Sequence, residues 1–120
     1  MRAFFRSFVF AWAGIVDFFK NHRNAQFHLF ATVLLVVLGF YFGLSKLEWM
    51  AIVVCIFMVT ALEAMNSAVE YLTDLVSPDY HPLAGKVKDM AAGAVLLAAM
   101  GAAIIGIMVF GPYLLQLIPN

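Results

Sequence analysis

The chain alternates long apolar stretches with short segments that hold nearly all of its charge. Residues 29–45, 49–62 and 90–120 contain no Asp, Glu, Lys or Arg. A membrane-spanning helix needs about 20 largely apolar residues, so the second stretch is too short unless its helix continues through Glu63 toward Leu72. We therefore predict transmembrane helices over about residues 28–45, 49–73 and 88–117.

Composition agrees with an all-α membrane protein that forms a single domain over residues 1–120. Hydrophobic residues make up 65% of the chain and charged residues only 12%, against about a quarter charged in an ordinary soluble domain. A soluble core of this size has no room for so much apolar surface, so the surplus must face lipid. The formal net charge of zero gives no indication of a nucleic-acid partner. The single cysteine, Cys55, excludes an internal disulfide and is interpreted as a small hydrophobic residue.

An aromatic segment precedes the three predicted spans. Residues 1–24 combine the basic residues Arg2, Arg6 and Lys20 with many phenylalanines and a tryptophan. This pattern is typical of an amphipathic helix that lies in the membrane interface. We expect such a surface helix here, and a buried structural helix is the alternative.

The basic residues predict the orientation, because they concentrate on the cytoplasmic side of membrane proteins. Six of the seven precede the first span or lie between the second and third, and only Lys46 lies between the first and second. The N-terminus and the segment 74–89 are therefore expected in the cytoplasm, and the C-terminus outside.

The third predicted span is rich in alanine and glycine. Small residues let helices approach closely in lipid, where apolar burial gives no driving force. Three helices also offer little interior in which to bury acids, so we expect a homo-oligomer. Packing of this helix within one subunit is the alternative.

The end of the second span, LEAMNSAVEYLTD, carries acids where lipid-facing residues are expected. At about 100° per residue, five polar residues fall on one helix face within an arc of about 100°. This set, called the polar ladder below, consists of Glu63, Asn66, Ser67, Glu70 and Asp74. Glu63 lies deepest, about 10 Å from Glu70 along the helix axis. Acids inside a span are costly and usually mark a site or pathway, and a structural seam that fixes helix register is the alternative.

The polar ladder holds groups suited to phosphoryl transfer at the membrane surface. A deep carboxylate can act as a general base, and a second carboxylate with an amide oxygen offers hard ligands to Mg²⁺. Lys88 and Asp89 begin the third span on the same side, where a lysine can bind phosphate. The sequence has no GxxxxGK loop. A pathway through a small oligomeric transporter is the alternative, and ATP binding distinguishes the two.

The segment from Glu63 to about Leu97 resembles the signature of bacterial integral-membrane diacylglycerol kinases, a family that includes undecaprenol kinases. The shared frame is E-x-x-N-S-A-x-E, an Asp four residues on, and a K-D pair before a small-residue helix. The resemblance implies a homotrimer in the bacterial cell (inner) membrane, with active sites shared between subunits. It implies transfer of the ATP γ-phosphate, with Mg²⁺, to the hydroxyl of diacylglycerol or undecaprenol.

The resemblance also implies roles for matching residues. Glu63 is expected to be the catalytic base, Glu70 a metal ligand near the ATP phosphates, and Asn66 an orienting group in the site. Lys88 is expected to hold phosphate, while Asp89 and Asp74 help to fix the nucleotide. The other residues expected to contact ATP are Phe10, Asp79, Tyr80 and His81.

One position departs from the family pattern. An ungapped match places His22 where the family usually carries a second metal-binding glutamate. Neutral imidazole suits transition metals better than Mg²⁺, so the departure puts metal affinity in doubt and makes a homologue with weak or altered activity the second hypothesis. The other interpretation is that His22 is a surface histidine and that the ligand is supplied elsewhere.

Overall fold

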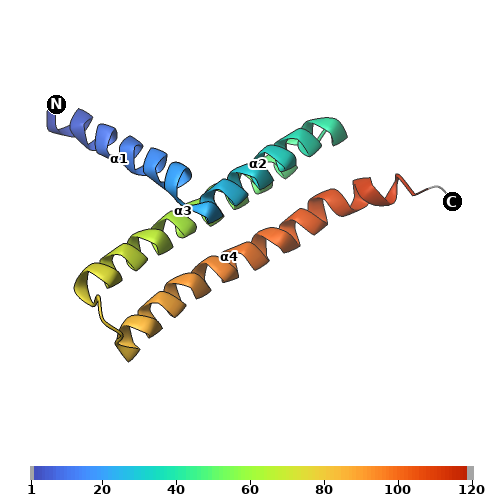
Figure 1. The fold of residues 1–120 in the computed structure, drawn as a ribbon. Coiled ribbons are helices and arrows are strands. Elements are labelled where there is room, and N and C mark those ends of the chain that lie inside the picture. The colour runs from blue at the N-terminus through green and yellow to red at the C-terminus, as the bar shows by residue number, and fades with distance from the viewer. Residues whose placement is uncertain (1, 119–120) are drawn as a thin grey trace.

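The computed structural model describes the backbone of residues 2–118 and the side chains of residues 4–118. Met1, with which the predicted surface helix starts, and the side chain of Arg2 lie outside this description. The described chain is all-α, as predicted, and its helices are drawn in Figure 1. In chain order they are α1 (Arg2–Asn21), α2 (Arg23–Phe42), α3 (Lys46–Val76) and α4 (Pro82–Leu115).

Three of these helices, α2, α3 and α4, are long and apolar enough to cross a membrane, as the prediction of three transmembrane helices requires. They run alternately up and down, and α3 packs along much of α4 (Figure 1). Residues 43–45 join α2 to α3 and residues 77–81 join α3 to α4. The end of the bundle at the first connection is called the Leu44 end, and the opposite end the Ser77 end.

The connection at the Ser77 end is shorter than the 74–89 segment expected there. α3 continues to Val76, and α4 begins at Pro82 rather than at residue 88. Proline is favoured in the first helical turn, where its missing N–H has no intrahelical partner to lose. His81 caps the same turn by accepting a hydrogen bond from the Leu83 N–H at 3.2 Å. These two local signals start the helix before its charged residues.

The bend between α1 and α2 also differs from expectation. The sequence predicts a surface helix to about residue 24 and a first span from about residue 28, whereas α1 ends at Asn21 and α2 starts at Arg23. His22 between them is extended, with φ −107° and ψ 120°. No proline or glycine marks this break in the sequence. Figure 1 shows α1 leaving the bundle at this bend.

The main apolar core lies at the Leu44 end. Its buried residues are Leu44, Ile52, Val109 and Phe110. Gly43 ends α2 in the left-handed conformation (φ 68°) that glycine adopts without steric cost. The core thus joins α2, α3 and α4 at the end of the bundle opposite the polar ladder.

Glu48 links this core to the start of α3. Ser45 and Glu48 form a capping box, in which the Glu48 carboxylate accepts a hydrogen bond from the Ser45 N–H at 2.7 Å. Tyr113 of α4 donates its hydroxyl to the same carboxylate at 3.0 Å. One side chain therefore caps α3 and holds α4 beside it.

We expect Gly39→Ala to destabilise the Leu44 end. A Cβ at this position would lie 2.7 Å from a ring atom of Trp49 and 3.1 Å from Leu44 Cδ1, and Trp49 is itself packed against Phe40. Overpacking of this kind costs roughly 1–3 kcal/mol, which should lower the thermal unfolding midpoint in detergent. Gly85→Ala is the control, because no atom lies within 4 Å of a Cβ there. An equal loss in both variants would contradict the close contact at Gly39.

Candidate active site

The polar ladder occupies the part of α3 nearest the Ser77 end. Glu63, Asn66 and Ser67 are only 4%, 8% and 8% exposed, whereas Glu70 is half-buried and Asp74 is exposed. The exposed fraction therefore rises along the ladder from Glu63 to Asp74, in the order of depth expected from the rise along the helix axis. Glu63 is the acid most thoroughly removed from solvent.

Hydrogen bonds within α3 order part of the ladder and leave one buried polar atom of the described chain, Asn66 Oδ1, unpaired. Asn66 Nδ2 donates to Glu70 Oε1 at 3.3 Å, and Ser67 Oγ donates to the Glu63 carbonyl at 3.1 Å. Asn66 Oδ1 has no partner in the part of the chain that the structure describes. Nor does any hydrogen bond or ion pair of residues 4–118 involve the Glu63 carboxylate. An unpaired buried polar atom destabilises a fold, so Asn66 Oδ1 is an acceptor that a ligand could satisfy.

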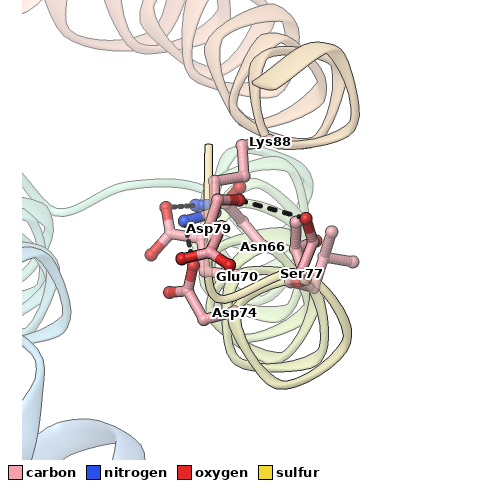
Figure 2. A network of polar contacts seen from close by, with 8 residues as sticks. Asn66, Glu70, Asp74, Ser77, Asp79 and Lys88 are labelled. Carbon is pink, nitrogen blue, oxygen red and sulfur yellow. Dashed lines mark hydrogen bonds and ion pairs between the residues drawn. The ribbon is translucent and has the colours of Figure 1, made fainter. Parts of the chain in front are cut away.

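Lys88 brings a positive charge from α4 to the ladder. Its Nζ lies 2.5 Å from Asp74 Oδ1, with the two side chains 37% and 62% exposed. Figure 2 shows the pair beside Glu70 and Asn66. An exposed ion pair contributes about 0–1 kcal/mol to stability, so its main consequence is the position of the ammonium group. Asp89, the next residue, is exposed.

The residues expected to contact ATP from the connection lie at the same end of the bundle. Ser77 Oγ donates to the Asp79 carbonyl at 3.2 Å, which shapes the turn (Figure 2). Tyr80 is 92% exposed, and His81 caps α4. Among the described residues, no hydrogen bond joins Asp79, Tyr80 or His81 to the ladder.

The two site residues expected from the N-terminal segment form no side-chain hydrogen bond with the ladder among the described residues. The side chain of Phe10 on α1 is 66% exposed and makes no ring contact with another aromatic side chain within residues 4–118. His22 Nε2 lies 2.8 Å from the Tyr71 hydroxyl. Its ring also contacts Phe18 and Tyr71, at centroid distances of 5.6 Å and 5.3 Å. No hydrogen bond of the described chain joins His22 to Glu70.

Tyr71 is the site residue that the sequence did not indicate. It follows Glu70 but lies about 80° around the helix from Glu63, outside the predicted polar face. Its partner His22 is 49 residues away in the chain. Helical periodicity cannot detect a pair of this kind, because the contact depends on how α1 and α2 fold back on α3.

The ladder offers oxygen ligands of the kind that Mg²⁺ prefers. They are the Glu70 carboxylate and the unpaired Asn66 Oδ1, with the Asp74 carboxylate one turn beyond. The described residues contain no group of three or more His, Cys, Asp and Glu side chains that alone could hold a metal ion. Since Mg²⁺ is commonly bound by one or two carboxylates together with substrate phosphates, the ladder fits a metal that arrives with a nucleotide.

A cavity of about 630 Å³ lies between α1, α2 and α3, beside the ladder. This α1 cavity is lined mainly by apolar side chains, including Ile15 and Phe18 of α1 and Ala64 of α3. Ser67 and Tyr71 reach it from the flank of the ladder. Its walls suit a hydrocarbon chain whose polar end lies near the ladder.

A second cavity, of about 370 Å³, lies between α2, α3 and α4. On α3 it is lined by Val59, Ile56 and Ile52, which continue the face of Glu63 toward the Leu44 end. Ile56 lines both cavities, and so do Thr32 and Thr60. The two cavities therefore provide apolar space from Ser67 and Tyr71, beside the ladder, to the part of α3 between Glu63 and the Leu44 end.

Known proteins are similar in sequence to this chain over nearly its full length. The family model described as prokaryotic diacylglycerol kinase matches residues 9–110. An undecaprenol kinase of Bacillus subtilis (strain 168) is 42% identical over 114 residues, which cover 95% of this chain and 93% of that protein. A diacylglycerol kinase of Synechocystis is 39% identical over 112 residues, covering 92% of this chain and 64% of the relative. A diacylglycerol kinase of Escherichia coli (strain K12) is 28% identical over 95 residues, covering 79% and 78%.

The matched region contains the polar ladder, the Lys88–Asp89 pair and the helices that position them. The resemblance stated from the E-x-x-N-S-A-x-E frame is therefore confirmed. The chain belongs to the prokaryotic diacylglycerol kinase family.

Proposed function

We propose that this protein is a membrane lipid kinase that transfers the γ-phosphate of ATP to the hydroxyl of a lipid alcohol. The observation that carries the proposal is a buried carboxylate without a partner, Glu63, at the deep end of a polar ladder and beside apolar cavities. Relatives named undecaprenol kinase and diacylglycerol kinase support the same reaction class. The acceptor is accordingly undecaprenol or diacylglycerol.

Glu63 acts as the general base in the proposed reaction. The acceptor's hydrocarbon lies in the apolar cavities, and its hydroxyl meets the carboxylate at the level where α3 becomes polar. The lipid oxygen bonds to the γ-phosphorus as the bond from that phosphorus to the ADP oxygen breaks. The hydroxyl proton passes to Glu63, whose carboxylate no other described group neutralises.

The more exposed half of the ladder binds the nucleotide. Lys88 holds phosphate oxygens, and Asp74 orients the Lys88 ammonium through the ion pair between them. Glu70 and Asn66 would hold Mg²⁺, which neutralises phosphate charge when it is bound. Four further residues are proposed to contact ATP around this centre: Asp89, Asp79, Tyr80 and His81.

Orientation and assembly are part of the proposal. ATP is cytoplasmic, so the Ser77 end faces the cytoplasm and the C-terminus lies outside, as the basic residues predict. The exposed aromatic residues Phe4, Phe8 and Trp12 favour α1 in the membrane interface. A homotrimer with shared sites would bring Phe10 to a nucleotide that it does not approach within one chain. Exposed leucines on α4, such as Leu96 and Leu97, supply apolar surface for contact with lipid or a second subunit.

The reaction is tested with purified protein in detergent, radiolabelled ATP and a panel of lipid alcohols. We expect labelled phosphatidic acid from diacylglycerol or labelled undecaprenyl phosphate from undecaprenol, and no labelled lipid without an acceptor. The relative kcat/KM of the two acceptors identifies the preferred one. Absence of product with every acceptor, from protein that is folded and binds ATP, would contradict the proposed function.

Glu63→Gln tests the base. The amide keeps the shape of the side chain but cannot accept the hydroxyl proton, so kcat should fall by roughly 10²- to 10⁴-fold while ATP affinity changes little. Glu48→Gln is the matched control, because Glu48 lies at the Leu44 end and caps a helix. Near-normal turnover in Glu63→Gln would remove Glu63 from the mechanism.

Lys88→Met tests the phosphate contact. Loss of a charge-assisted hydrogen bond weakens binding by roughly tenfold or more, so the KM for ATP should rise while the KM for the lipid acceptor does not. Lys46→Met, at the Leu44 end, should leave both constants near those of the unmodified protein. If the two lysine variants behave alike, the ammonium of Lys88 does not bind the nucleotide.

A further inference from the structure

The bend between α1 and α2 is joined to α3 by one polar contact. His22, the single residue between the two helices, is half-buried, and its Nε2 lies 2.8 Å from the Tyr71 hydroxyl. Phe18, only 6% exposed, packs beside the His22 ring. α1 and α3 touch at few places in the described chain, so this polar contact contributes to how α1 lies against α3.

The same pair borders the α1 cavity. His22 and Tyr71 both line it, and α1 supplies the wall opposite α3 through Gly14, Ile15 and Phe18. A displacement of α1 would therefore open the cavity and change its width. Tyr71 also lies next to Glu70 in the chain, so the pair stands at the height of the proposed nucleotide site.

The surroundings of His22 are unlike those of a metal ligand. Nε2 is one of the two ring nitrogens able to bind a metal, and here it contacts the Tyr71 hydroxyl. The ring lies against Phe18 and Tyr71, and the described chain forms no hydrogen bond between His22 and a carboxylate. Imidazole is in any case a poor ligand for Mg²⁺.

We propose that His22 and Tyr71 are positioning residues for the lipid acceptor: their hydrogen bond holds α1 over the α1 cavity, and His22 takes no part in binding the metal. This inference rests on the proposed lipid kinase function. In this proposal, the histidine that replaces the family's glutamate at residue 22 contributes to lipid binding. The metal is bound by Glu70, Asn66 and the nucleotide.

The test compares Tyr71→Phe, His22→Ala and the double variant. Each loses the same hydrogen bond, so each should raise the KM for the lipid by about three- to tenfold, with kcat at saturating lipid within about twofold. The double variant should be no worse than His22→Ala, because coupled residues are not additive. His22→Gln should recover part of the loss, since its amide oxygen can accept from the Tyr71 hydroxyl. Tyr41→Phe, on an exposed tyrosine of α2, is the control.

Metal binding is measured separately from turnover, by titrating Mn²⁺ into the full-length protein with a non-hydrolysable ATP analogue and following free Mn²⁺ by electron paramagnetic resonance. The Mn²⁺ dissociation constant should stay within about twofold in all variants. Weaker Mn²⁺ binding in His22→Ala but not in Tyr71→Phe would show that His22 is a metal ligand. An unchanged lipid KM in Tyr71→Phe would overturn the positioning role.

The position of α1 gives a readout that needs no kinase activity. Trp12 and Leu75 are exposed, and each is replaced by cysteine in a Cys55→Ala background and labelled with a nitroxide. The labelled protein is diluted with unlabelled protein. The distance between the two nitroxides then reports the separation of α1 and α3. Tyr71→Phe should broaden this distance distribution. If the distribution broadens but the unmodified protein phosphorylates no lipid, the kinase proposal fails while the pair still holds α1. An unchanged distribution would show that the pair does not hold α1.

Discussion

The cost of placing Glu63 and Asn66 inside a membrane-spanning helix is the constraint on which the rest of the structure depends. A carboxylate at this depth must be shielded from lipid, so the helix that carries it has to lie against other helices. α4 packs along the ladder helix and brings Lys88 to its more exposed part. The unpaired Asn66 Oδ1 and the Glu63 carboxylate are then left as the groups available to a ligand.

The two ends of the bundle meet different physical requirements. At the Leu44 end, tight packing around Gly39 and Trp49 and the double use of Glu48 hold three helices together. Toward the Ser77 end the helices are separated by cavities and carry exposed charge. Under the proposed function, the packed end keeps the helices in place, and the α1 cavity and the exposed charges lie on the side where acceptor and nucleotide would bind.

His22 departs from the family pattern, and its contacts in the fold suggest a different role from the one that its position in the sequence implies. In the sequence, His22 stands where the resemblance places a metal-binding glutamate, which is why metal affinity was in question. In the fold it is the residue at which α1 turns into α2, and its ring nitrogen meets a tyrosine one residue past the ladder's own Glu70. α1 forms one wall of the apolar cavity, so under the proposed function residue 22 bears on binding of the lipid acceptor.

The sequence by itself determined the three apolar helices and the polar face of α3, because span length and helical period are local properties of the chain. It also supplied the E-x-x-N-S-A-x-E frame that identifies the family. The start of α4 at Pro82 also follows from local signals, the proline and the His81 cap, although the apolar pattern alone does not show it. Only the tertiary structure decided the break at His22, the His22–Tyr71 contact and the cavities. These depend on contacts between segments far apart in the chain, which no periodic pattern records.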